Sequence, residues 1–237
     1  MTTAGRPRLM TKKRPGETAR DEIRDAAAEL FTTRGYTNTS TRMIAEAVGM
    51  RQASLYHHFA GKDDLLDSLL SGTVDEPLAV GRAMRAADAS AVEKMYALAL
   101  YDADQLCRSR WNLGALYLLP ELREERFATF RAHRYALMDL YASIASEVLD
   151  DISVGERQTG MQEIPFRLVE TVVNSRADSE NGRTMVEADH ARIVAQAAVR
   201  SLGWTGPIDR VDARARALIE SIGPHVYPDE LETDGAR

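Results

Sequence analysis

A single glycine, Gly49, separates two short helical patterns and restricts what the first quarter of the chain can fold into. The pattern before it begins at Ser40, a residue favoured at helix N-caps, and keeps apolar residues on one face through Val48. The pattern after it runs from about Arg51 to Phe59. Two short helices joined by a tight turn at a glycine are typical of a helix-turn-helix unit. The segment therefore predicts such a unit.

A longer helix is expected ahead of this unit. Thr18, followed three residues later by Asp21, has the pattern of a capping box with Asp in place of the usual Glu, and Gly35 is a suitable helix end. Apolar residues between them recur on one helical face. Residues 1–16 hold five Lys or Arg, two prolines and no such periodicity. They are expected to form a disordered basic arm.

Charge is distributed unevenly along the chain. Residues 1–62 carry 11 Lys/Arg and 6 Asp/Glu, a net of +5, and residues 63–237 carry 19 and 30, a net of −11, which together give −6. A basic front part on an acidic remainder suits a polyanion-binding module attached to a domain with another role. The charge distribution alone is explained equally well by a basic tail that keeps the protein in solution.

The remaining sequence also predicts helices, with no convincing strand, so the expected fold class is all-α. Helices are expected at 62–71, 77–87, 90–108, 113–119, 121–149, 165–176, 187–202 and 207–222, followed by an acidic tail at 229–237. Hydrophobic residues make up 44% of the chain, which is enough to bury a core.

Cysteine content and hydropathy restrict the compartment. Cys107 is the only cysteine, so an internal disulfide cannot form and a reducing cytoplasmic location is expected. No run approaches 18 uninterrupted apolar residues, so no membrane span is expected. The basic N-terminus lacks an apolar signal segment, which argues against export.

The run STRMIAEAVGMRQASLYHHFAGKDDLL, residues 40–66, resembles the DNA-binding domain of TetR-family transcriptional repressors. The shared features are a Ser/Thr-capped helix, Ile-Ala, a turn glycine, Leu-Tyr-x-His-Phe, and a lysine that opens a fourth helix. The resemblance is specific over about residues 17–66, whereas beyond them only length and helical character match. It implies a three-helix helix-turn-helix DNA-binding domain at 17–62 and a larger helical ligand-binding and dimerisation domain at 63–228.

The function implied by this resemblance is that of a ligand-responsive transcriptional regulator, a repressor released from a palindromic operator by a small-molecule effector. The tyrosines and the tryptophan of the candidate pocket described below suit an aromatic or phenolic compound as that effector. The expected partners are double-stranded operator DNA, the effector and a second copy of the chain; no cofactor is expected. A homodimer also follows from geometry, because two recognition helices must meet successive major grooves. Its interface is expected at 164–176 and 187–202, where Val186, Ile193, Val194, Ala197, Ala198 and Leu202 lie on one side.

The resemblance also implies which residues contact DNA. The second helix begins at Ser40, Thr41 and Arg42, where free N–H groups and a cation suit a phosphate. The recognition helix begins with Arg51, Gln52, Ala53 and Ser54, and the Gln52 side chain can read adenine. The phosphates are clamped by Tyr56, His58 and Lys62. The expected DNA-binding residues are Ser40, Thr41, Arg42, Arg51, Gln52, Ala53, Ser54, Tyr56, His58 and Lys62.

The adjacent histidines, His57 and His58, do not indicate a metal site. They point to different sides of a helix, and the sequence has no HxxxH or CxxC spacing. His58 is expected at the DNA backbone, and His57 exposed. No Ser-His-Asp spacing, phosphate loop or metal motif supports an enzyme. The remaining competitor is an effector-independent DNA-binding protein without a functional pocket.

Charged residues on apolar helical faces mark a candidate effector site. Asp102 lies on the apolar stripe of 90–108, and Arg134 on that of 121–149. Burying a charge is costly unless it is paired or used. One interpretation is an Asp102–Arg134 bridge between packed helices. The other is a pocket for a small ligand with hydroxyl or carboxylate groups. Its lining would be Asp102, Arg134, Arg131, Tyr96, Trp111, Tyr117 and Tyr135.

Overall fold

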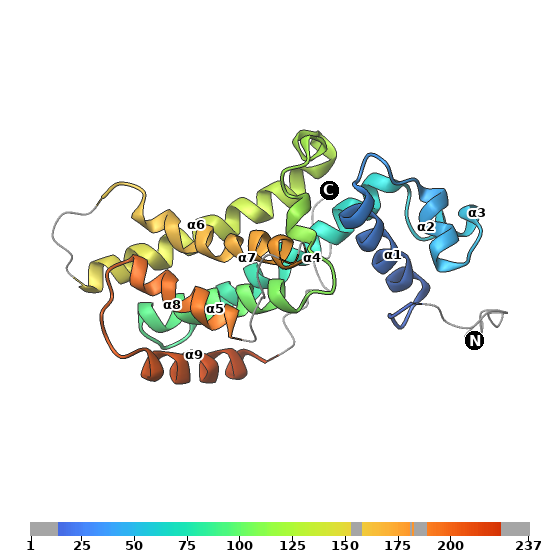
Figure 1. Cartoon of the computed structure of the whole chain (residues 1–237). Helices are drawn as coiled ribbons and strands as arrows, with labels where there is room; N and C mark the ends of the chain where they lie inside the picture. The colour runs from blue at the N-terminus through green and yellow to red at the C-terminus, as the bar shows by residue number, and fades with distance from the viewer. Residues whose placement is uncertain (1–13, 153–157, 181, 183–188, 224–237) are drawn as a thin grey trace, which may run out of the picture. The chain divides into compact units, whose positions relative to one another are not determined.

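The computed structural model describes residues 14–152, 158–180, 182 and 189–223, and every regular element among them is a helix (Figure 1). The predicted all-α fold class is confirmed for these residues. The chain divides into two compact units, Met1–Leu70 and Ser71–Arg237, and α4 (Lys62–Ala86) runs from the first into the second. The acidic tail predicted at 229–237 lies outside the described residues, as do residues 1–13 of the predicted arm.

α1 (Ala19–Arg34) begins and ends where the sequence predicts. The Thr18 hydroxyl accepts a hydrogen bond from the Asp21 N–H at 3.2 Å, and the Asp21 carboxylate accepts one from the Thr18 N–H at 2.9 Å. These two bonds complete a capping box, so the shorter Asp side chain can take the place of Glu. Gly35 ends the helix with φ 84°.

α2 (Thr41–Val48) and α3 (Gln52–Leu55) form the predicted helix-turn-helix. The Ser40 hydroxyl caps α2 by accepting a hydrogen bond from the Met43 N–H at 3.2 Å. Gly49 ends the helix in the left-handed region, with φ 76°, where a side chain would strain the backbone.

α3 is shorter than the expected 51–59. After Leu55 the chain tightens into turns, in which the His57 N–H bonds to the Ser54 carbonyl and the His58 N–H to the Leu55 carbonyl. Bonds that span three residues close tighter turns than an α-helix. Phe59 is nevertheless buried, as its place in the apolar pattern predicts.

Arg14 lies within the predicted basic arm but belongs to the folded unit. Its guanidinium group pairs with Asp25 at 2.8 Å and with Glu29 at 2.7 Å, both on α1, and its Nε donates to the Ala47 carbonyl of α2 at 3.2 Å. Its side chain is only 13% exposed. The disordered arm expected for 1–16 therefore does not extend to Arg14, because one guanidinium satisfies three acceptors at once.

α5 (Ala91–Arg108) is the central helix of the second unit. It packs against α6 (Ala128–Ile152), α7 (Ile164–Glu180), α8 (His190–Ser201) and α9 (Ile208–Ile222). A helix covered from several sides must be apolar nearly all round, and the five residues from 96 to 100 are all buried. α5 thus forms the middle of the unit's hydrophobic core.

α4 is one helix where the sequence predicts two. A break is expected before Pro77, because proline has no N–H to donate to the carbonyl four residues earlier. The helix nevertheless continues through Pro77. That carbonyl belongs to Thr73, and it accepts a hydrogen bond from the Gln105 side-chain amide of α5 at 3.0 Å. A tertiary contact therefore replaces the helical bond that proline removes.

Short 3₁₀ turns connect α5 to α6 where the sequence predicts helices at 113–119 and from 121. They are η1 (Leu113–Leu116), η2 (Pro120–Arg123) and η3 (Glu125–Phe127), and a further one, η4 (Met161–Glu163), precedes α7. Pro120 begins a turn instead of ending a helix, which its fixed φ favours. In the described part of the chain, no helix is long and apolar enough to cross a membrane.

Candidate functional site

Three polar side chains join α2 to α3 on the surface of the helix-turn-helix. Thr41 opens α2, Gln52 opens α3, and Tyr56 follows α3. The Gln52 amide donates to the Thr41 hydroxyl at 2.9 Å and to the Tyr56 hydroxyl at 3.3 Å, and the two hydroxyl oxygens lie 3.1 Å apart. The Tyr56 side chain is half exposed. This cluster contributes nothing to the apolar core, and a ligand can reach its hydrogen-bonding groups.

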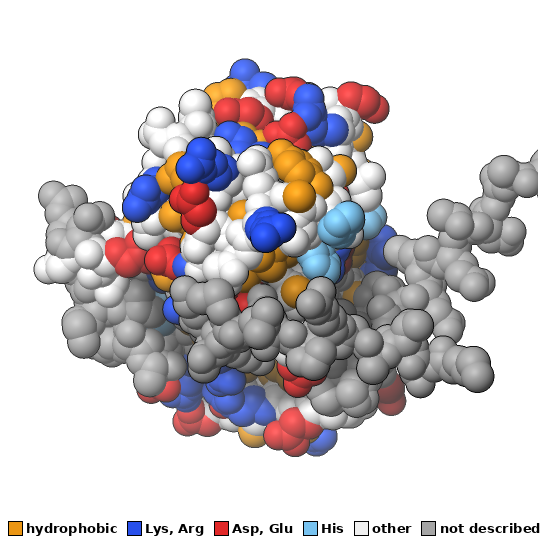
Figure 2. All heavy atoms as spheres, turned by 90° about the vertical axis from the view of Figure 1, so that its right-hand side faces the viewer, with side chains coloured by type: hydrophobic (Ala, Val, Ile, Leu, Met, Phe, Trp, Pro, Cys, Tyr) orange, Lys and Arg blue, Asp and Glu red, His pale blue; other side chains and the backbone are white. Residues whose placement is uncertain are grey.

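The start of α3 is open to solvent. Residues 51–54 are all exposed, whereas Leu55 is fully buried and fixes the helix on the core. Arg42 is also exposed, with its Nε paired to Glu46 at 2.8 Å. Figure 2 shows histidine side chains beside exposed hydrophobic and basic ones on the face turned toward the viewer, with basic and acidic side chains mixed above them and to their left. A helix-turn-helix contacts phosphates and base edges through exposed polar residues at the starts of its two short helices.

Lys62 and His58 are held by contacts within the unit. The Lys62 ammonium donates to the Tyr36 carbonyl at 3.0 Å and lies 4.1 Å from the centre of the Tyr36 ring. It retains two further donors for a phosphate. The His58 carbonyl accepts a hydrogen bond from Arg20 at 2.6 Å, and the His57 side chain is exposed. No group of three His, Cys, Asp or Glu side chains that could hold a metal ion occurs among the described residues.

Asp102 is buried in the second unit, with 4% of its surface exposed. One carboxylate oxygen accepts a hydrogen bond from the Tyr141 hydroxyl at 3.0 Å, and the other from the Gln105 amide at 3.0 Å. Burial raises the pKa of Asp102 to about 6, an effect that these hydrogen bonds oppose and the charge of Glu170 adds to. The carboxyl group therefore changes its charge close to neutral pH.

Arg134 pairs with Glu170 of α7 and not with Asp102. Its guanidinium group also lies 5.5 Å from the centre of the Tyr117 ring and 5.4 Å from that of Phe166. The predicted Asp102–Arg134 bridge is therefore wrong. α7 supplies an acid whose position the apolar stripes of the two other helices could not reveal.

Tyr117 lies beside both charged groups. Its hydroxyl donates to the Thr73 hydroxyl at 2.6 Å, and burial raises its pKa, an effect that the charge of Asp102 adds to and that of Arg134 opposes. Asp102 is thus buried close to the half-buried Tyr117, whose ring faces the guanidinium group of Arg134, and whether these three residues bind an effector stays a prediction. Gln105, which was not among the predicted site residues, donates to Asp102 and to the carbonyl of Thr73, the residue whose hydroxyl accepts the bond from Tyr117.

The other four residues predicted for the effector site lie elsewhere. Tyr96 is fully buried and donates to Asp212 of α9 at 2.9 Å. Arg131 donates to two carbonyls of the 3₁₀ turns, each at 2.6 Å. Trp111 lies under the guanidinium group of Arg110, and Tyr135 is 56% exposed. The apolar stripes identify buried positions, but they do not show which neighbouring helix a buried side chain faces. Tyr96 faces α9, whereas Asp102 faces α6.

Gln105, Thr73 and Tyr141 are the functional candidates that the sequence patterns missed. Gln105 donates both to Asp102 and to the Thr73 carbonyl, to which Pro77 has no N–H to donate. The buried acid is thereby connected to α4. The one signal that could have revealed this is Pro77 itself, because a proline inside a helix leaves an acceptor four residues earlier that needs a donor.

The helices expected at the dimer interface have both buried and exposed apolar residues. Val194 and Ala198 of α8 and its C-cap residue Leu202 are buried within the chain's own core, so half of the six residues of the predicted stripe are intramolecular. Val186 lies outside the described residues. Ile193 is 52% exposed, and Ile164 of α7 is 42% exposed. Both helices thus expose an apolar side chain in the described part of the chain.

Comparison with known proteins agrees with this architecture. Residues 23–69 match the family model described as bacterial regulatory proteins, tetR family. The chain is similar to the crystal structure of AmtR from Mycobacterium smegmatis, with 50% identity, coverage of 87% of this chain and 97% of that one, and a TM-score of 0.81. The transcriptional regulator KstR2 of Mycobacterium tuberculosis shares the fold at 21% identity, over 80% of this chain and 95% of that one, with a TM-score of 0.63.

The sequence of the HTH-type transcriptional repressor KstR2 from Rhodococcus jostii RHA1 is 46% identical over 57 residues, which are 24% of this chain and 28% of that protein. The match to this relative therefore spans less than a third of its length. The helix-turn-helix lies within the residues that the family model matches. This chain belongs to the TetR family, whose members are regulators and not enzymes.

Proposed function

We propose that the protein is a transcriptional repressor that binds a palindromic operator as a homodimer and is released from it by a small-molecule effector. The observation that carries the proposal is the exposed cluster of Thr41, Gln52 and Tyr56 on the helix-turn-helix. The 50% identity with AmtR over most of both chains supports it. So does the name of the KstR2 relatives, which are transcriptional repressors.

In the proposed complex, α2 binds phosphate and α3 enters the major groove. The N-terminus of α2 attracts anions, and Thr41 and Arg42 add a hydroxyl and a cation there. Gln52 and Ser54 reach base edges from the start of α3. Gln52 would then exchange its hydrogen bonds with Thr41 and Tyr56 for bonds to a base. The two hydroxyls, released from the amide, become free to bind the DNA backbone.

A homodimer is required by this mode of binding. One chain carries one helix-turn-helix, whereas a palindromic operator presents two half-sites about 34–36 Å apart or at multiples of that distance. The outer faces of α7 and α8 offer the surface for pairing, since Ile164 and Ile193 are exposed there. Antiparallel helices from two subunits commonly pair as a four-helix bundle.

The buried cluster around Asp102 is the proposed point of effector control. Inside an apolar core an ionised carboxylate is costly, so a ligand that pairs with it or replaces its neighbours gains free energy there. The rings of Tyr117 and Phe166 suit an aromatic ligand, and Asp102 and Arg134 suit hydroxyl or carboxylate groups. A phenolic compound would meet both requirements.

α4 would carry the response. Gln105 connects Asp102 to Thr73, and α4 continues from Thr73 back to Lys62 in the DNA-binding unit. A ligand that competes for Gln105 would alter the hydrogen bonding of α4 next to Pro77. Release of DNA further requires that the ligand bind the released state more tightly than the DNA-bound state.

DNA binding is tested with an operator selected from a random duplex pool and then measured by fluorescence anisotropy at several salt concentrations. Lys62→Ala should weaken all sequences alike and lower the salt slope by about one. Gln52→Ala should instead lose about 1–3 kcal/mol of discrimination at one base pair of each half-site. Arg210→Ala, on α9 of the other unit, is the control and should change neither the salt dependence of the affinity nor the discrimination between base pairs. Equal weakening of every sequence by Gln52→Ala would refute the groove assignment.

Effector control is tested separately from DNA binding. The competing function, an effector-independent DNA-binding protein, is favoured by one observation: both oxygens of Asp102 are already occupied by the protein's own side chains. Small aromatic and lipid-like metabolites are screened for a shift in melting temperature, and those that bind are tested for operator release. Release that is lost in Asp102→Ala, with operator affinity kept, supports the proposal. Binding without release supports the competitor.

A further inference from the structure

A cavity of about 420 Å³ lies between α5, α8 and α9 in the second unit. Asp102, Tyr117 and Arg134 are not among the residues that line it, so it is distinct from the proposed effector cluster. Leu100, Ala191 and Ile219 give it an apolar surface. A volume of several hundred Å³ with apolar walls and a few polar groups is typical of a small-molecule site.

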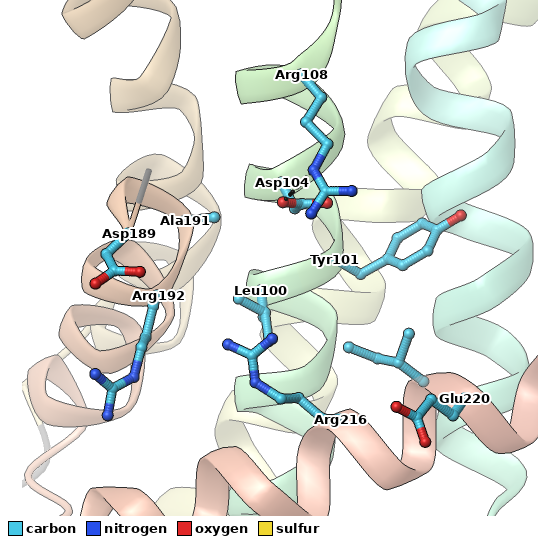
Figure 3. A pocket seen from close by; sticks show the side chains of 10 residues that line it. Leu100, Tyr101, Asp104, Arg108, Asp189, Ala191, Arg192, Arg216 and Glu220 are labelled. Carbon is cyan, nitrogen blue, oxygen red and sulfur yellow. Dashed lines mark ion pairs between the residues drawn. The ribbon is translucent and has the colours of Figure 1, made fainter. Parts of the chain in front are cut away.

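Three arginines line this cavity, one from each helix. Arg108 extends from α5, Arg192 from α8 and Arg216 from α9 (Figure 3). In that view the guanidinium groups of Arg108 and Arg216 lie on either side of Leu100. In the same view the Arg192 guanidinium group is directed away from these two, and the packing of α5 against α9 positions Arg108 and Arg216.

The acidic partners of Arg108 and Arg216 leave some of their terminal nitrogens available, whereas Arg192 pairs through Nη2 with Asp209 at 3.0 Å. Arg108 is bound through Nε by Asp104 at 2.9 Å, and Arg216 through Nε by Asp212 at 2.9 Å. A second bond from Arg216 to Asp212 uses Nη2. Among the described residues, no hydrogen bond or ion pair involves Nη1 of Arg216 or either terminal nitrogen of Arg108. A planar guanidinium can bind a carboxylate through these positions while Nε keeps its own partner.

Asp212 fixes two of the three arginines in place. It accepts hydrogen bonds from Arg216 and from the fully buried Tyr96, and Arg192 lies 3.6 Å away. Burial acts to raise the pKa of Asp212, but the hydrogen bonds from Arg216 and Tyr96 and the arginine charges outweigh it and lower the pKa overall. The carboxylate stays ionised and holds the arginines before any ligand arrives, which reduces the entropy lost on binding.

The acidic lining sets the charge of the ligand. Asp104, Asp189 and Glu220 also line the cavity, so its three positive groups face three negative ones. A polyanion would meet repulsion from Asp189 and Glu220, which no arginine of the cavity neutralises in the described structure. A single anionic group that reaches Arg108 and Arg216 avoids this repulsion. The apolar surface requires that the rest of the ligand be apolar.

We propose that this cavity is a second ligand site, which binds a small organic monoanion consisting of a carboxylate on an apolar body. The carboxylate pairs with the free guanidinium nitrogens of Arg108 and Arg216. The apolar body packs against Leu100 and Ile219.

Isothermal titration calorimetry on the full chain tests this proposal with hexanoate and octanoate as probes and hexanol as the neutral counterpart, because none of them carries the aromatic ring that the proposed effector cluster favours. Saturable binding of a carboxylate at one site per chain is expected, and no saturable binding of the alcohol. Arg108→Gln and Arg216→Gln should each weaken the carboxylate at least about tenfold, because each removes a charge-assisted hydrogen bond. Arg108 is 80% exposed, so its replacement leaves the fold intact, which the melting temperature checks.

Two controls locate the site. Arg214→Gln lies on α9 outside the lining and should leave the affinity unchanged. Asp102→Asn should also leave it unchanged, because Asp102 belongs to the other cluster. The proposal is overturned if neither carboxylate binds saturably, if Arg214→Gln weakens binding as much as Arg216→Gln, or if only Asp102→Asn abolishes it. The last result would place the anion in the proposed effector cluster.

Discussion

Tyr141 donates a hydrogen bond to Asp102 at 3.0 Å in the interior of the second unit, where both side chains are buried. The same hydroxyl lies 3.2 Å from the Leu98 carbonyl oxygen, so one proton faces two acceptors when Asp102 is ionised. A protonated Asp102 can donate to Tyr141, which leaves the Tyr141 hydrogen for Leu98. Burial raises the pKa of both side chains. The site is therefore better matched to a neutral carboxyl group than to a carboxylate.

Asp102→Asn should stabilise the protein near neutral pH, because the amide reproduces the hydrogen bonds of the protonated acid. The pKa of Asp102 is about 6 in the folded protein and 3.8 as its reference value. Between these values the folded state binds more protons than the unfolded state, so stability falls as pH rises through this window and then levels off. The total loss in the wild type is about 3 kcal/mol.

Urea unfolding of both proteins between about pH 4 and about pH 7 measures this effect. The advantage of Asp102→Asn should grow as pH rises and become constant above the window. Asp139→Asn, at an exposed position of α6, is the matched control and should show no such growth. A stability difference for Asp102→Asn that is the same at every pH would contradict the prediction.

Gln105→Leu should destabilise the protein by about 1–3 kcal/mol, because the half-buried Thr73 carbonyl loses the hydrogen bond from the Gln105 amide. The cost should be smaller when Pro77 is also replaced by Ala, since the new backbone N–H can bond to Thr73 within α4. Urea unfolding of the wild type, the two single variants and the double variant gives this coupling directly. Part of the cost should persist, because Gln105 also binds Asp102. An equal cost in both backgrounds would show that Gln105 does not compensate for the proline.

Ile193→Glu should raise the dissociation constant of the homodimer at least about tenfold, because an unpaired charge buried in an interface costs more than about 1.4 kcal/mol. Leu118→Glu is the control, since Leu118 is 92% exposed and lies outside α7 and α8. Analytical ultracentrifugation of the three proteins measures the difference. A monomeric wild type at micromolar concentration, or equal weakening by both variants, would rule out the proposed interface.

The helix-turn-helix could be predicted from the sequence because its signals are local. Ser40 and Thr18 cap the N–H groups of residues three positions further on, and Gly49 binds carbonyls three and four positions back. The length of α3 was overestimated because an apolar pattern that reaches Phe59 does not distinguish a helix from the turns that bury the same residue.

The buried polar groups could not be predicted in the same way. The partner of Arg134 is 36 residues away, that of Asp102 39 residues away and that of Tyr96 116 residues away. Periodicity shows which face of a helix is apolar, but not which other helix covers it. The pairing of Arg134 with Glu170 instead of Asp102 follows from the packing of α7, which no pattern within α5 or α6 contains.

The proline inside α4 makes two distant positions depend on each other during evolution. A lineage that keeps Pro77 needs a long hydrogen-bond donor at position 105 to serve the Thr73 carbonyl. A lineage that loses the proline recovers the helical bond, and position 105 becomes free to change. Among homologous sequences the two residues should therefore be inherited as a pair, with a donor at 105 wherever proline occupies 77. The order of substitution is restricted as well, since proline can enter α4 at low cost only after the donor is present.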